Sequence, residues 1–158
     1  MIGQRTNAHE FFDIHVMPTY EDWSKDPINI RLAMSAAVVL NHMADYVWHT
    51  YKALDPVRIF NTKTCGDFRA ELAIRNPHFA IIRDVAEAHK HLMLDRNSRV
   101  LTSTEQTSVG TTNWGNTGFG TGPFGGGPSI IVKLDDETKY HFAYLADEVR
   151  RIWVSMIA

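Results

Sequence analysis

The stretch that decides the fold is DPINIRLAMSAAVVLNHMADYVWHTYKALDP, residues 26–56. It begins with Asp26-Pro27, where aspartate suits the N-cap of a helix and proline its first position, and Asp55-Pro56 ends it. Nothing between these signals breaks the helical pattern, so we expect a helix over 27–54. At 100° per residue its apolar side chains span an arc of about 200°, which predicts burial on most sides and a central place in the fold. The arc holds Leu32, Ala33, Ala36, Ala37, Val39, Leu40, Met43, Ala44, Val47 and Trp48.

Further helices are predicted on both sides of this central one. A short helix is expected over 8–17, ending before Pro18, and another over 66–75. Asn76-Pro77 repeats the start signal and predicts a helix over 77–95. A last helix is expected over 143–157. The predicted buried faces of the last two helices contain Ile81, Ile82, Val85, Ala88 and Leu92, and Leu145, Val149, Ile152 and Met156.

Between about 99 and 142 the pattern changes to that of a β element. Three stretches are rich in β-branched or aromatic residues and predict strands, at 99–109, 129–134 and 138–143. We therefore expect one domain over 1–158, of α+β class and mainly α. It would be a helical bundle with a small antiparallel β insertion between the penultimate and last helices.

The composition excludes several classes of function. The chain has 158 residues, 44% of them apolar, and a net charge of −2, so nothing in its overall charge attracts nucleic acid or an acidic membrane. The single cysteine, Cys65, excludes an internal disulfide. The sequence shows neither a signal peptide nor a run of about 18 apolar residues, so we expect a soluble, cytoplasmic protein without a membrane partner.

The stretch WGNTGFGTGPFGGGP, residues 114–128, repeats an aromatic residue at every fifth position. The three aromatic residues are Trp114, Phe119 and Phe124. They would pack on the protein's own surface or contact a partner. The stretch contains no Lys or Arg, which favours a protein partner, above all a second copy of the chain, over nucleic acid.

Residues 120–125, GTGPFG, match the Gly-x-Gly-x-x-Gly pattern of dinucleotide-binding loops. That pattern binds phosphate only between a strand and the start of a helix. Here a strand follows, no helix is predicted to start, and Pro123 removes an amide donor. We therefore expect no nucleotide cofactor.

Two helices carry an acid followed four residues later by a histidine, Asp45–His49 and Glu87–His91. His42 shares a face with the first pair. If the two polar edges faced each other, carboxylate and imidazole groups would suit a divalent zinc, iron or manganese ion. The alternative to a metal site is that these are ordinary i,i+4 surface pairs. No other cofactor is expected.

His89 falls on the apolar face of its helix, so we expect it to be buried and neutral. The segment IRDVAEAHKH, residues 82–91, resembles the signature of the HEPN superfamily, in which an Arg and a polar residue precede a His on a helix. Arg83, Asp84 and His89 match it. The resemblance implies a metal-independent ribonuclease, in which Arg83 would steady the phosphate of RNA and His89 would transfer a proton. His91 is a second candidate for that role, since it lies nearer to Arg83 around the helix.

Three hypotheses for the function follow, in decreasing order of preference. The first is a non-catalytic interaction protein that forms homo-oligomers through the bundle or through the aromatic stretch. The second is an HEPN-like ribonuclease using Arg83 with His89 or His91. The third is a metal-binding bundle using His42, Asp45, His49, Glu87 and His91.

Overall fold

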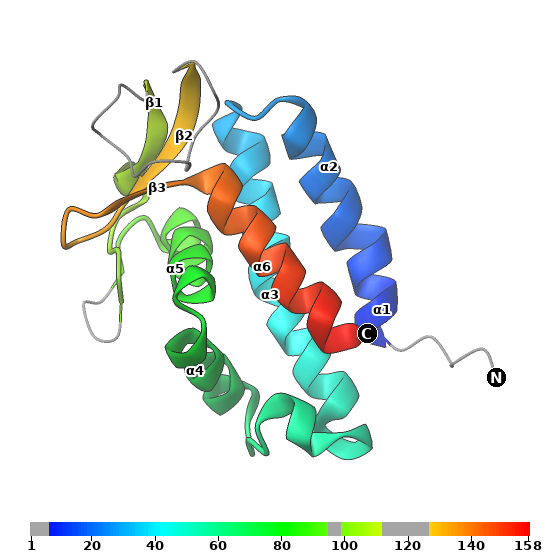
Figure 1. The fold of residues 1–158 in the computed structure, drawn as a ribbon. Coiled ribbons are helices and arrows are strands. Elements are labelled where there is room, and N and C mark those ends of the chain that lie inside the picture. Colours follow the sequence, from blue (N-terminus) through cyan, green and yellow to red (C-terminus); the bar gives the residue numbers. More distant parts are fainter. Residues whose placement is uncertain (1–6, 95–98, 112–126) are drawn as a thin grey trace.

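The computed structural model describes residues 7–94, 99–111 and 127–158 and shows a bundle of helices beside a small sheet (Figure 1). In chain order the elements are α1 Asn7–Phe11, the π-helical segment η1 Phe12–Val16, α2 Met17–Lys25, α3 Ile30–Leu54, the 3₁₀ turn η2 Pro56–Ile59, α4 Cys65–Arg75, α5 Pro77–His91, the 3₁₀ turn η3 Thr104–Gln106, β1 Thr107–Thr111, β2 Pro128–Lys133, β3 Lys139–His141 and α6 Phe142–Ile157. The predicted class, α+β and mainly α, is confirmed, with the sheet inserted between the last two helices.

Helix α3 is the centre of the bundle, and Figure 1 shows α6 crossing in front of it, between α2 and α5. Four of its alanines, which let neighbouring backbones approach closely, are wholly buried: Ala33, Ala36, Ala37 and Ala44. The indole of Trp153 on α6 is also wholly buried, and its Nε1 donates a hydrogen bond to the Leu40 carbonyl oxygen at 2.9 Å. A buried indole of this kind typically contributes about 3–5 kcal/mol relative to alanine. The predicted central role of this helix is confirmed.

The start of α3 differs from the prediction. The helix begins at Ile30 because Asn29, rather than Asp26, is its N-cap, and Asn29 accepts a hydrogen bond from the Leu32 amide at 3.3 Å. Asp26 instead accepts from the Asn29 side chain and so supports the turn before the helix. Both residues are good N-caps, and the sequence alone did not decide between them.

The N-terminal helix continues past the predicted stop at Pro18. Residues 7–25 are helical throughout, with the π-helical segment η1 placed just before the proline. The Met17 amide donates to the Phe12 carbonyl, so the ladder shifts by one residue and Pro18 enters at the start of a new α-helical segment. Proline is tolerated there because it has no amide to contribute and none is required.

Helix α5 is shorter than predicted and ends at His91. Leu92 has a φ of 65°, which takes the backbone out of the helix, and its side chain is 60% exposed instead of buried. The prediction for Leu92 is therefore wrong. The other four predicted contacts of this helix, Ile81, Ile82, Val85 and Ala88, are buried.

The β element is confirmed at residues 107–141, but its predicted first strand is too long. Residues 104–106 form a 3₁₀ turn because Ser103 and Gln106 make a capping box. The Gln106 side-chain oxygen accepts from the Thr102 and Ser103 amides and so competes with strand pairing. The sheet has the order β1-β2-β3 and is antiparallel throughout, with Thr107 opposite Val132 and Val132 opposite Tyr140.

None of the helices in the described ranges combines the length and apolar character needed to cross a membrane.

Candidate functional site

Charged side chains from three helices meet in one cluster, which we call the ionic network. Helices α3, α4 and α5 each contribute to it, and the chain segment before β1 adds one more residue. Its members are Asn41, Asp45, Cys65, Arg69, Arg83, Asp84, Glu87 and Arg99. Three arginines and three carboxylates give the network a formal charge of zero.

Asp84 is the buried anchor of the ionic network. Its side chain is 0% exposed. Arg83 Nε and Arg99 Nη1 donate to its Oδ1 at 2.8 and 3.0 Å, and the Val100 amide donates to its Oδ2 at 2.7 Å. A buried carboxylate needs such compensation, because removing a charge from water is costly. Asp84 therefore fastens the segment after α5 back onto the helix.

Glu87 and Asp45 are linked through Arg69. Arg69 on α4 donates to Asp45 Oδ1 at 3.0 Å and lies 3.6 Å from Glu87 Oε1. It also donates to the Asn41 side chain. The other Glu87 oxygen lies 2.6 Å from Arg99 Nη2. The guanidinium groups thus bridge three helices, with Arg69 between the two carboxylates that the metal hypothesis brought together.

Cys65 completes the network on the α4 side. Its Sγ donates to Asp45 Oδ1 at 2.9 Å. Burial, followed by the hydrogen bond and charge of Asp45, raises the pKa of the thiol to about 12, well above its ordinary value of 9.0. The thiolate is the nucleophilic form of cysteine, so at neutral pH this protonated side chain is a poor nucleophile.

The residues of the ribonuclease hypothesis lie in different environments. Arg83 is held by buried Asp84, whereas His89 is exposed. The predicted burial of His89 is wrong because it stands in the last turn of α5, where His89, Lys90 and His91 are all exposed. A positive side chain in a last helical turn, such as Lys90, interacts favourably with the helix dipole.

The residues of the metal hypothesis do not gather into a ligand set. His42, His49 and His91 are exposed, and the His49 ring lies edge-on against Trp48 at 4.9 Å between centroids. Across the part of the chain that the structure describes, no three His, Cys, Asp or Glu side chains are arranged to hold a metal ion. The carboxylates of Asp45 and Glu87 pair with arginine instead.

The aromatic residues predicted to contact a partner, Trp114, Phe119 and Phe124, lie outside the described residues.

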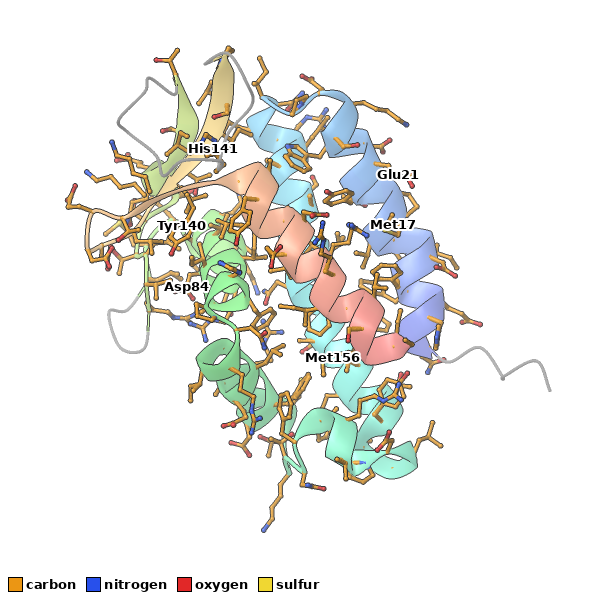
Figure 2. All side chains as sticks on the ribbon, in the orientation of Figure 1. Met17, Glu21, Asp84, Tyr140, His141 and Met156 are labelled. Carbon is orange, nitrogen blue, oxygen red and sulfur yellow. The ribbon has the colours of Figure 1, made fainter. Side chains whose placement is uncertain are left out.

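The polar pair His141–Ser129 was not identified from the sequence. His141 ends β3 and precedes α6, and its Nδ1 lies 3.0 Å from the Ser129 hydroxyl on β2. The histidine is only 2% exposed, and its Nε2 has no hydrogen-bond partner among the described residues. Burial lowers the pKa of His141 below its ordinary value of 6.5. Figure 2 marks His141 and Asp84 at separate places in the molecule.

Arg69 and Arg99 were also missed, because nothing in their local sequence distinguishes them from other surface arginines.

Comparison with known proteins gives no relative: no protein-family model, no curated protein sequence and no solved structure matches this chain.

Proposed function

We propose that this is a non-catalytic assembly protein that associates with copies of itself. The proposal rests on the most exposed side of α3, which we call the outer strip of α3; its two valines also pack partly against the core. Its members are Arg31, Ser35, Val38, Val39, His42, Tyr46, His49 and Ala53. The two valines are half-buried and the other six residues are exposed.

The outer strip of α3 is unusual for a solvent face because it is nearly free of charge. Arg31 is its only Lys, Arg, Asp or Glu over more than six helical turns. A surface helix ordinarily carries charged residues on the face opposite its core. Protein interfaces, by contrast, are depleted of charged residues at their centres and enriched in aromatic ones such as Tyr46.

The ionic network supports the non-catalytic part of the proposal. Its three carboxylates each lie beside an arginine, and the Cys65 thiol is kept protonated. A general base or a nucleophile needs an accessible group with a pKa suited to its task. The network instead has the composition of a clamp between helices.

Light scattering after size-exclusion chromatography tests self-association. The chain has a mass of 18.0 kDa, and we expect the measured mass to rise above this value as protein concentration increases. A mass that stays at 18.0 kDa up to about 1 mM would contradict the proposal, since a dissociation constant above that corresponds to less than about 4 kcal/mol of binding.

The alternative function is the HEPN-like ribonuclease, and the exposure of His89 and His91 is the observation that favours it. An exposed imidazole is accessible to RNA, as general acid–base chemistry requires. The test is incubation of labelled RNA with the protein in EDTA. We expect no cleavage. Cleavage that disappears in both Arg83→Ala and His89→Ala would replace the assembly proposal with the enzymatic one.

We also propose a cytoplasmic location, because a free cysteine thiol is typical of proteins in a reducing compartment.

A further inference from the structure

We infer that two copies of this chain dock through their outer strips of α3, running antiparallel, with the twofold axis passing beside His42. The inference rests on the proposed self-association and specifies its surface, direction and register. The charge, the direction and the size of the strip each favour a second copy as the partner.

The charge of the outer strip fits a copy of itself better than it fits another class of partner. A nucleic acid would call for several Lys or Arg side chains, and the strip has only Arg31. A strongly acidic or basic protein would find little to pair with. Two nearly neutral strips meet without like-charge repulsion, and a self-complementary patch is what a twofold interface requires.

The position of Arg31 sets the direction. It is the second residue of α3, where the positive end of the helix dipole disfavours a cation, and it makes no ion pair with any residue in the described ranges. In an antiparallel pair Arg31 lies over the C-terminal end of the partner's α3, where the dipole is negative. Asp55, the C-cap of α3, pairs with Arg58 of its own chain at 3.2 Å, and 45% of its side chain remains exposed there. A parallel pair would instead place two Arg31 side chains together.

The extent of the outer strip sets the register. The strip runs from residue 31 to residue 53, so complete overlap of two antiparallel strips centres on residue 42. His42 then faces the partner's His42, Ser35 faces the partner's His49, and Val38 faces the partner's Tyr46. Serine and valine opposite larger rings allow the side chains to interdigitate, as close helix packing requires.

The size of the surface predicts a weak dimer. At 1.5 Å per residue the strip is about 33 Å long. One flank is widened by α1 and η1, where Phe11 stacks on Tyr46 with ring centroids 3.8 Å apart and Ile14 is 63% exposed. A single helix strip with one flank stays at or below the standard interface of about 800 Å² per partner. Interfaces at this low end of the size range are typical of weak, transient association.

Disulfide trapping tests the register. Cys65 is first replaced by serine, which keeps a hydrogen-bond donor for Asp45. In that background, His42→Cys places two thiols across the axis, where Cα atoms of packed helices come within the span of a disulfide. We expect a covalent dimer of His42→Cys under mild oxidation at micromolar concentration, on a non-reducing gel.

The matched control is Ser35→Cys in the same background. It is exposed on the same strip, but its thiol lies about 21 Å from its counterpart along an antiparallel pair, so it should not cross-link with itself. Mixed with His49→Cys, it should form the heterodimer. Circular dichroism of each variant checks that the helices are intact.

The outcomes separate this inference from the proposed function. Cross-linking of Ser35→Cys with itself as readily as His42→Cys would overturn the register. An unmodified protein that dimerises by light scattering while His42→Cys stays monomeric on the gel would overturn the surface and leave self-association standing. If replacing Trp114, Phe119 and Phe124 with alanine abolishes the dimer and His42→Cys does not cross-link, the surface is likewise overturned and self-association still stands. A protein that is monomeric in both experiments overturns both proposals.

Discussion

Asp84 shows how much a single buried charge contributes to this fold. Its carboxylate receives hydrogen bonds from two arginines and one backbone amide, and no part of its side chain reaches solvent. Removing one partner of a buried ionic cluster leaves the others desolvated and unpaired, which is the costly case.

We expect Asp84→Ala to lower the free energy of unfolding by about 3–5 kcal/mol, because Arg83, Arg99 and the Val100 amide lose their acceptor. Urea denaturation followed by circular dichroism measures this. The matched control is Asp22→Ala, since Asp22 pairs with Lys25 at 3.9 Å on the surface and should change stability little. Equal effects of the two substitutions would show that the ionic network does not anchor the segment after α5.

His141 gives the fold a dependence on pH. Burial lowers the pKa of its imidazole below 6.5 in the folded chain, whereas the unfolded chain takes up a proton near that ordinary value. The unfolded state therefore binds more protons as the pH falls through 6.5. Stability is fully present above about pH 6.5 and decreases as the pH falls from there towards the lower pKa of the folded state.

The measurement for His141 is the free energy of unfolding between pH 7.5 and pH 5.5. We expect His141→Gln to show a smaller decrease over this interval than the unmodified protein, because glutamine does not titrate. His42→Gln is the control, since His42 is exposed. If His141→Gln and the unmodified chain lose stability in parallel, another group is responsible for the decrease.

Among the elements, α6 depends on a contact at its C-terminal end. Arg58 on η2 donates from Nη1 to the Met156 carbonyl at 2.9 Å, and its guanidinium lies 4.5 Å from the centre of the Tyr51 ring. The last carbonyls of a helix lack partners within the helix, so an arginine that reaches them stabilises the end.

Substitution of Arg58 by Met should lower stability by about 1–2 kcal/mol, because a charged hydrogen bond to a helix end is lost while much of the apolar contact stays. In this variant, hydrogen exchange should accelerate more at the last turn of α6 than at its first turn. Arg151→Ala is the control on the same helix, since Arg151 is 66% exposed. Unchanged exchange at the end of α6 would mean that η2 does not hold it.

The elements also show what sequence reasoning can predict. Helix α3 was predicted well because a wide apolar arc is a property of one segment and needs no partner to be recognised. The helix end predicted at Pro18 is wrong because the π-helical segment before it accommodates the missing amide. No local sequence signal indicates that shift. Residues 104–106 were misread because β-branched composition outweighed the Ser103–Gln106 capping box, a local signal that was present.

The site was less predictable than the fold. Asp45 and Glu87 were recognised from helical spacing, and Arg83 and Asp84 from the HEPN resemblance. Spacing on one helix does not show which side chain of another helix will face it. Arg69 supplies that answer only through the packing of α4 against α3 and α5. His89 was predicted to be buried and is exposed, because it stands in the last turn of α5, where only Ala88 is still buried.

At the scale of the whole molecule, three arginines and three carboxylates pair in a neutral clamp between helices, while the outer strip of α3 carries a single charged side chain. A solvent face with so little charge is unusual, since exposed surfaces are ordinarily rich in charge. A second copy covering the outer strip of α3 would explain it.

Sedimentation equilibrium of the unmodified protein and of His42→Glu tests this claim most directly. A glutamate at residue 42 brings two like charges together at the proposed axis, whereas Ala143→Glu adds the same charge on exposed α6, outside the strip. We expect the unmodified protein and Ala143→Glu to approach twice 18.0 kDa with rising concentration, while His42→Glu stays near 18.0 kDa. Identical masses for all three proteins would contradict it.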